Sequence, residues 1–186
     1  MSAIRKGGVL LTGAAMVALM GGAAMAQNNN ANGNKPETTP SDMRFAKEAA
    51  QGGNAEVRLG QMAVAKASDP QVKQFGQKMI DDHTKANNQL QSIASKDNIT
   101  LPTGISARDK ATYDSLSKLS GTAFDRAYMR DMVKDHQTDV NEFQQEANNG
   151  SNPDLKSFAG STLSTLQGHL RQARDTDASL SSRSSR

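Results

Sequence analysis

Apolar residues recur at alternating steps of three and four along four long stretches of the chain, at about residues 42–67, 70–97, 122–148 and 153–176. This spacing places them on one face of a helix, so each stretch is expected to form a helix with one buried side. A shorter helix is expected at 107–119. Residues 99–104 should form an extended connection, and no run alternates as a strand does. The pattern therefore predicts an all-α fold.

Residues that commonly cap helices stand where these stretches begin. A side-chain oxygen before the first turn accepts hydrogen bonds from backbone N–H groups that have no partner inside the helix, and proline is favoured at the first helical position. The predicted starts are Asp69 before Pro70, Asn152 before Pro153, Ser106 with Asp109, and Thr122 with Asp125.

Each long helix carries one titratable residue within its apolar stripe, and the chain's three histidines are all among them: Glu56, His83, His136 and His169. A carboxylate or imidazole buried without a partner is costly. If the four helices pack face to face, these side chains converge, where they either satisfy one another or hold an ion. These four residues are the candidate metal ligands.

Two of the histidines end related five-residue motifs 53 positions apart, MIDDH at 79–83 and MVKDH at 132–136. The related positions extend to Phe75 with Tyr128 and to Leu90 with Phe143, so the chain carries two related helices. The motifs add a second tier of candidate ligands: Asp82, Asp135, Asp139, Met79 and Met132.

These second-tier residues also have plainer interpretations. Methionines at helical spacing usually fill a core, which is the favoured interpretation of Met79 and Met132. Asp82 and Asp135 lie about 100° around the helix from their histidines, and are expected at the edge of the stripe. From there either could accept a hydrogen bond from a histidine on a neighbouring helix. Asp139, three residues after His136, is an alternative ligand.

Loop lengths predict the level of each group along the bundle. Glu56 lies 11 residues before position 67 and His83 lies 13 after Pro70, so the two should face each other. His136 lies 12 residues before position 148, whereas His169 lies 16 after Pro153, which puts His169 about 6 Å out of level and makes it the weakest candidate. The long connection after residue 97 can return the 122–148 helix parallel to the 70–97 helix. This is a four-helix bundle with one crossover, as in ferritin-like folds.

The first 26 residues are expected to be a signal peptide. A basic pair, Arg5 and Lys6, precedes an apolar run at 8–22, and an Ala-Met-Ala cleavage pattern ends at Ala26. Residues 27–41 are rich in Asn, Pro and Thr and should form a disordered linker, and residues 178–186 a disordered tail. The bundle domain should therefore occupy 42–177. With no cysteine and no later apolar run, the product is expected to be a periplasmic protein without a transmembrane segment.

The charge of the chain argues against nucleic acid as a partner. Removal of the signal peptide takes two of the 22 basic residues and none of the 19 acidic residues, which leaves a net charge of about +1. The basic pI belongs to the precursor and to the tail.

Four segments together resemble the bacterial DUF4142 family: FAKEAAQGGNAEVRLGQMA, VKQFGQKMIDDH, FDRAYMRDMVKDH and LKSFAGSTLSTLQGHL, all between residues 42 and 174. The resemblance implies an exported protein with a ferritin-like four-helix fold and an inward Glu/His set. The family's function is unknown. The Glu-x-x-His pairs of ferritin-like di-iron proteins are absent here, because Ile80 and Val133 stand where the glutamates would be.

Two classes of function follow. The first is a metal-binding envelope protein, with imidazoles and a carboxylate suited to Zn, Fe, Mn or Cu, and with Met-His pairs that favour copper. The alternative is a non-enzymatic structural or interaction bundle with an envelope protein partner, in which the Glu/His set only specifies packing. An oxidase-type enzyme ranks third. No catalytic residue is assigned.

Overall fold

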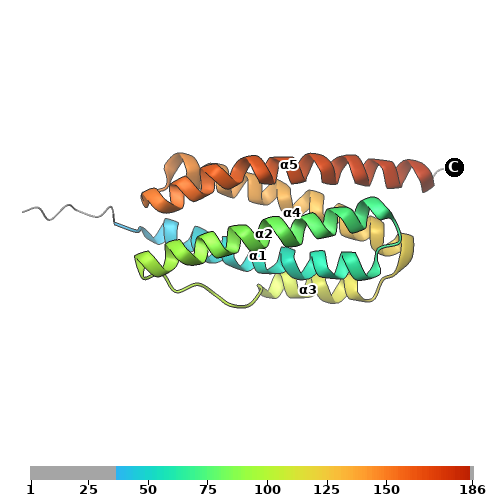
Figure 1. The fold of residues 1–186 in the computed structure, drawn as a ribbon, viewed down its shortest axis with the longest axis horizontal. Helices are drawn as coiled ribbons and strands as arrows, with labels where there is room; N and C mark the ends of the chain where they lie inside the picture. Colours follow the sequence, from blue (N-terminus) through green and yellow to red (C-terminus); the bar gives the residue numbers. More distant parts are fainter. Residues whose placement is uncertain (1–36, 185–186) are drawn as a thin grey trace, which may run out of the picture. The chain divides into compact units, whose positions relative to one another are not determined.

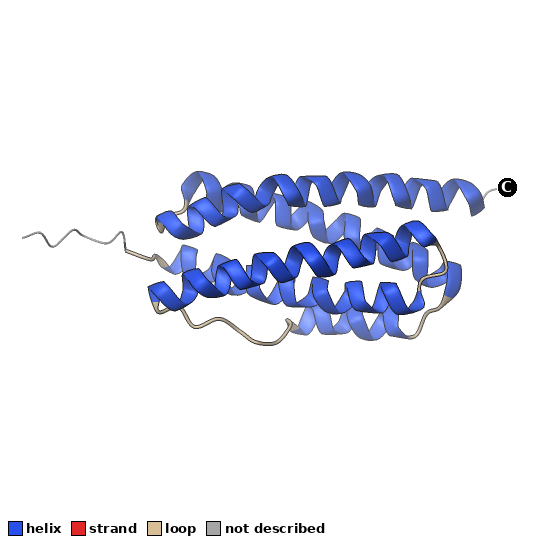
Figure 2. Ribbon diagram, viewed as in Figure 1, coloured by secondary structure: helices blue, strands red, loops and turns tan. Residues whose placement is uncertain are grey.

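The computed structural model describes residues 37–184, in which five helices and no strand are present. They are α1 (Pro40–Lys66), α2 (Pro70–Asp97), α3 (Ala107–Ser117), α4 (Gly121–Asn149) and α5 (Pro153–Ser184) (Figures 1 and 2). The predicted signal peptide, most of the predicted linker and residues 185–186 lie outside the described part. Within that part, no helix is both long enough and apolar enough to cross a membrane.

The helix starts follow the cap chemistry in three of the four predicted places. Asp69 accepts from the N–H of Gln71 ahead of α2, and Ser106 forms a capping box with Asp109 ahead of α3. Asn152 accepts from the N–H groups of residues 154 and 155 at the start of α5. These caps act within a few residues of the chain, which is why the sequence alone predicts them.

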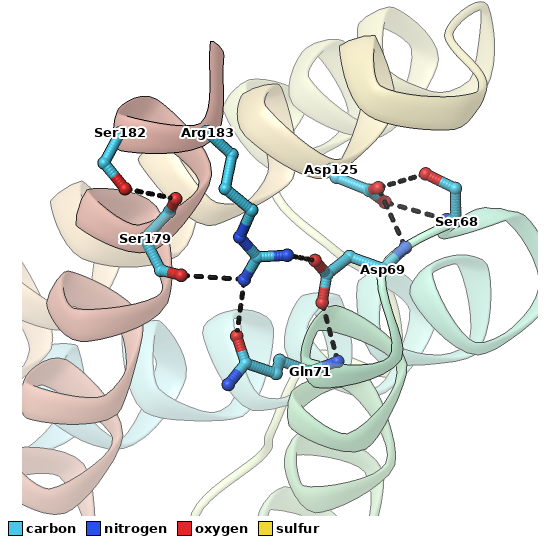
Figure 3. A network of polar contacts seen from close by, with 7 residues as sticks. All are labelled: Ser68, Asp69, Gln71, Asp125, Ser179, Ser182 and Arg183. Atoms are coloured by element: carbon cyan, nitrogen blue, oxygen red, sulfur yellow. Dashed lines mark hydrogen bonds and ion pairs between the residues drawn. The ribbon is translucent and has the colours of Figure 1, made fainter. Parts of the chain in front are cut away.

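The predicted cap at Thr122 is wrong. Helix α4 begins at Gly121, whose φ of +58° suits glycine, after an N-cap Ser120 whose side chain makes no capping bond. Asp125 instead reaches across to the α1–α2 turn, where it accepts bonds from the backbone N–H groups of Ser68 and Asp69 and from the Ser68 hydroxyl (Figure 3). A tertiary contact has replaced the local one.

Helices α2 and α4 run in the same direction, opposite to α1 and α5, as Figure 1 shows. Contacts at the helix ends agree with this topology. Asp125 at the start of α4 meets the start of α2, and Asp154 at the start of α5 pairs with Lys96 at the end of α2. The connection between α2 and α4 runs back along the bundle and contains α3. The predicted all-α, ferritin-like bundle with one long crossover is confirmed.

The core divides into two apolar clusters. The first includes Phe75, Tyr128 and Leu180, and the second includes Phe45, Leu90 and Phe143. On every long helix the titratable residue of the stripe falls between the residues of the two clusters. Together these four residues form one layer, called the polar layer below: Glu56, His83, His136 and His169, all buried.

Helices α1 and α2 approach closely at a pair of glycines just outside the polar layer. A Cβ added to Gly60 would lie 2.6 Å from the carbonyl oxygen of Gly76. Gly60 is one turn from Glu56 and Gly76 is two turns from His83, so this crossing fixes how near the two helices run beside the layer.

The two predicted ends of the bundle domain, at residues 42 and 177, differ from the structure. Helix α1 starts at Pro40, inside the predicted 27–41 linker, because Thr39 and the fully buried Asp42 form a capping box. The expectation of a disordered tail from 178 is wrong as far as Ser184, because α5 continues there. Leu180 packs in the first cluster, and Arg183 pairs with Asp69 at 2.6 Å (Figure 3).

Candidate metal centre

Three imidazoles meet in the middle of the bundle, one each from α2, α4 and α5. The ring centroids are 5.7 Å apart for His83 and His136, 5.5 Å for His83 and His169, and 5.2 Å for His136 and His169. Each ring contributes one nitrogen to a set of three nitrogens that all lie within 4.8 Å of one another. These three residues are called the histidine cluster below.

The hydrogen bonds of the cluster assign its tautomers. Nδ1 of His136 lies 3.0 Å from the carbonyl oxygen of Met132, and Nε2 of His169 lies 2.8 Å from Oδ2 of Asp82. A carbonyl or carboxylate oxygen only accepts, so each of these nitrogens carries the hydrogen and donates it. The predicted role of Asp82, orienting a histidine on a neighbouring helix, matches this contact.

One nitrogen of each ring receives no hydrogen bond within residues 37–184. These nitrogens are Nε2 of His136, Nδ1 of His169 and Nε2 of His83, and all three are buried. Since the hydrogens of His136 and His169 sit on the bonded nitrogens, the remaining nitrogen of each neutral ring is a lone pair. The cluster thus holds unused acceptor nitrogens away from water.

Burial keeps these rings neutral. The pKa of His83 lies well below its ordinary value, first because of burial and then because of its two histidine neighbours. Burial, then His169, lowers the pKa of His136 to about 4, and burial lowers the pKa of His169 against the opposing effect of Asp82. At neutral pH all three offer the form that ligates metals.

A small cavity adjoins the cluster on the side of His83. Its volume is about 20 Å³, measured as the space open to the centre of a water molecule, and its lining includes His83, Asp139 and Asn87. This is room for about one water. On the other side, the ring of Phe75 packs edge-on against His136 and His169 at 6.2 and 6.4 Å.

Glu56 belongs to the polar layer but lies apart from the histidine cluster. Its Oε1 is 4.0 Å from Nδ1 of His136, the nitrogen already bonded to Met132, and its carboxylate groups with Asp135 and His136. The side chain is fully buried and neither oxygen has a donor. Burial, and then Asp135, raises the pKa of Glu56 well above its ordinary range. The structure therefore divides the predicted four-residue set into three imidazoles and a separate carboxylate.

The second-tier residues are placed as follows. Met79 and Met132 pack in the first apolar cluster, as core residues do. Asp135 is half-buried beside Glu56, and Asp139 is half-buried at the cavity next to His83. Burial and then Asp135 raise the pKa of Asp139 well above its ordinary range.

The prediction that His169 lies out of level is wrong. By the observed helix ends, His136 lies 13 residues before Asn149 and His169 lies 16 after Pro153, a difference of about 4.5 Å between their backbones. Helical side chains lean toward the N-terminus of their own helix. In this antiparallel pair, His136 leans away from the α4–α5 turn and His169 leans toward it, which closes the gap.

Sequence reasoning missed Tyr128 and Asp131 as neighbours of the layer. The Tyr128 hydroxyl is buried without a partner, and burial, then the charge of Glu56, raises its pKa well above the ordinary value. Burial, then Asp135, raises the pKa of Asp131 to about 6. The available signals were the pairing of Tyr128 with Phe75 in the repeat, and the spacing of four residues between Asp131 and Asp135.

Comparison with known proteins identifies one family and several similar folds. The family model of a domain of unknown function, DUF4142, matches residues 27–176. No curated protein matches the chain. A DUF305 fragment from Deinococcus radiodurans has a similar fold, with a TM-score of 0.68 and 16% identity over 77% of this chain and 99% of that one. CopM in its Cu(II)-bound form is similar with a TM-score of 0.64 and 17% identity, over 74% and 96% of the two chains.

Proposed function

The chain belongs to the DUF4142 family, and we propose that it binds one transition-metal ion through His83, His136 and His169. The observation that carries this proposal is the convergence of three neutral imidazoles, each with one buried nitrogen that no described residue hydrogen-bonds. A metal ion would supply the missing partner of all three at once.

The donor set suits a borderline ion. Neutral imidazole nitrogen is a ligand for Zn, Cu, Fe and Ni. Metal-bound histidines usually donate their other N–H to a carbonyl or carboxylate, the arrangement that Met132 and Asp82 provide here. With three protein ligands, a fourth position stays open. The cavity beside His83 has room for one water there.

Copper is the first ion to test. CopM, which shares the fold at low identity, has been solved with Cu(II). The packing of Met79 and Met132 in the apolar core favours imidazole over thioether ligation. Zn²⁺ is the natural second ion, since it takes the same nitrogen ligands.

The proposal includes export to the periplasm, which rests on the apparent signal peptide at 1–26. Mass spectrometry of the protein from a periplasmic extract should find Gln27 as its first residue. A protein that keeps residues 1–26 would contradict this part of the proposal without affecting the metal site.

A double-mutant cycle tests the metal site. Untagged protein should carry about one ion per chain, and a free ion at 100 times its Kd should stabilise the fold by about 2.7 kcal/mol, a rise in Tm of roughly 5–10 °C. His83→Ala and His136→Ala should each weaken binding by more than about 100-fold, because even changes behind a ligand cost 10–100-fold. The double variant should lose little more.

Met79→Leu is the matched control, because it removes a sulfur one turn from His83 while keeping an apolar side chain of similar size. It should bind the ion as the wild type does. Additive losses of stability in the cycle, unaffected by added Cu²⁺ or Zn²⁺, would refute the shared site. That outcome would support the alternative function, a structural or interaction bundle whose polar layer specifies packing.

A further inference from the structure

A second set of possible ligands lies between α1 and α4. Glu56 comes from α1, and Asp135 and Asp139 come from α4, one turn apart on one face of the helix. A carboxylate oxygen of Glu56, a carboxylate oxygen of Asp135 and a ring nitrogen of His136 lie within 4.8 Å of one another. The charge of Asp139 also acts on Glu56. Glu56, Asp135 and Asp139 are called the carboxylate group below.

Glu56 is the group's buried member, and it lacks a hydrogen-bond donor. Its side chain is 0% exposed, and no described N–H or hydroxyl group donates to either oxygen. The neighbour within hydrogen-bond reach is the Asp135 carboxyl, which is also an acceptor, so the pair needs a proton or a cation between its members. The Tyr128 hydroxyl, also 0% exposed and unpartnered, is near enough to be affected by the charge of Glu56. A buried carboxylate without a donor or cation is costly to a fold. The two oxygens of Glu56 lie beside two further carboxylates and receive no hydrogen bond from a described donor, so a bound cation would complete this group.

The described part of the chain supplies little positive charge here. None of the ion pairs between described residues includes Asp135, Asp139 or Asp131. Arg108 of α3 acts on Asp139 and Asp131, and Lys134 of α4 acts on Asp131, but on both aspartates burial and Asp135 have the larger effects. Several carboxyl groups are thus held together with little positive charge beside them, and without a cation the raised pKa values of Glu56 and Asp139 mean that both hold their protons.

We propose that the carboxylate group is a second cation site, separate from the histidine cluster, that takes a hard divalent ion such as Mn²⁺. Its donors are oxygens, which such ions prefer. His136 forms a wall of this site and not a ligand, because its Nδ1 is already bonded to the carbonyl oxygen of Met132. Asp135 and Asp139 are only half-buried, so water can reach the ion and complete its coordination.

This inference goes beyond the proposed function, because it uses different residues and a different class of ion. The two sites adjoin at His136, whose Nδ1 lies 4.0 Å from Oε1 of Glu56, and at the cavity that His83 and Asp139 both line. One presents lone-pair nitrogens between α2, α4 and α5, and the other presents oxygens between α1 and α4. The chain can therefore hold two ions of unlike chemistry side by side.

The experiment titrates the untagged full chain with Mn²⁺ and follows the free ion by electron paramagnetic resonance. Glu56→Gln and Asp135→Asn should each weaken Mn²⁺ binding at least tenfold, while His169→Ala should bind Mn²⁺ as the wild type does. Asp81→Asn, an exposed charge change on α2, is the control and should have no effect. Circular dichroism at each step verifies folding, which Glu56→Gln should keep because it preserves volume.

The outcomes separate the two proposals. No Mn²⁺ binding up to about 1 mM, or binding that survives both carboxylate changes, would overturn the second site. Loss of Mn²⁺ binding in His169→Ala as well would also overturn it, because the two sites would then be one. Retained Mn²⁺ binding together with failure of the histidine variants to affect Cu²⁺ or Zn²⁺ would support the second site and refute the proposed function alone.

Discussion

Asp82 offers the sharpest test of how the histidine cluster is held. Its carboxylate accepts the N–H of His169 at 2.8 Å and also pairs with Lys78 at 2.7 Å. This contact holds the hydrogen on Nε2, so the buried Nδ1, which no described residue hydrogen-bonds, keeps its lone pair. The substitution Asp82→Asn keeps the shape of the side chain and an acceptor oxygen but removes the charge.

The size of the effect follows from the change of acceptor. A hydrogen bond to a charged group contributes about 1.5–3 kcal/mol, and a neutral one about 0.5–1.5 kcal/mol. The difference is about 1–1.5 kcal/mol, or roughly tenfold in an equilibrium constant. A bound metal makes the imidazole N–H more acidic, so most of this difference should appear as metal affinity. Because the lost Lys78 pair is partly exposed, it should change stability by less than about 1 kcal/mol.

Calorimetric titration with Cu²⁺ or Zn²⁺, against a competing chelator, measures the change. Asp81→Asn is the matched control, because Asp81 is the adjacent residue, is exposed and accepts a hydrogen bond from Gln77. Both variants lose one negative charge, but only the Asp82 change alters the contact with His169. We expect a loss of about tenfold for Asp82→Asn and almost none for Asp81→Asn. Equal affinities of the two variants would refute the orienting role.

Two further predictions concern stability. Gly60→Ala should destabilise the fold by up to about 2 kcal/mol, because overpacking against the Gly76 carbonyl outweighs a helix-propensity gain of about 1 kcal/mol. In the same helix, Gly52→Ala should stabilise the fold by about 0.5–1 kcal/mol, because an added Cβ meets nothing within 4 Å. Urea unfolding of the two variants measures these opposite changes in the free energy of unfolding. Burial, then Asp42, raises the pKa of Glu146 to about 7. The folded state therefore binds this proton more tightly than the unfolded state does. The free energy of unfolding should fall as the pH rises from about 4.5 through 7. Glu146→Gln should remove this contribution, so its stability relative to the wild type should grow across that window and then level off; a constant difference from pH 4 to 8 would contradict the assignment.

The helices and their inward residues were predictable because the signals are local and repeated. Each apolar stripe contains five or more residues on one helix face, so the assignment of the face does not depend on any single residue. The buried positions of Glu56, His83, His136 and His169 followed from these stripes. The end of α5 could also have been predicted, because Leu180 continues the seven-residue spacing of Leu166 and Ala173.

Other features depend on contacts that spacing does not encode. Asp125 has the spacing of a cap partner, yet its carboxylate bonds to the α1–α2 turn, and only the folded chain brings that turn near. The separation of Glu56 from the histidine cluster depends on which side of the His136 ring it approaches. A count of residues from a loop gives the height of a Cα atom, but the direction of the side chain decides whether two groups meet.

The directions of the hydrogen bonds in the polar layer favour the ligand-binding interpretation of this layer over the packing interpretation. A layer that only specifies packing would satisfy its own members, for instance through a bond from His136 to Glu56, but these two lie 4.0 Å apart, beyond hydrogen-bond distance. The bonds instead run outward, to the Met132 carbonyl on the same helix and to Asp82 at the edge of the bundle. Within residues 37–184, the remaining ring nitrogens stay unpaired at the level between the two apolar clusters. Each unpaired buried group costs about 1–3 kcal/mol, which an apolar layer would avoid and a bound ion would recover. This cost is the reason why we propose an occupant for the layer, since packing alone gives no return for it.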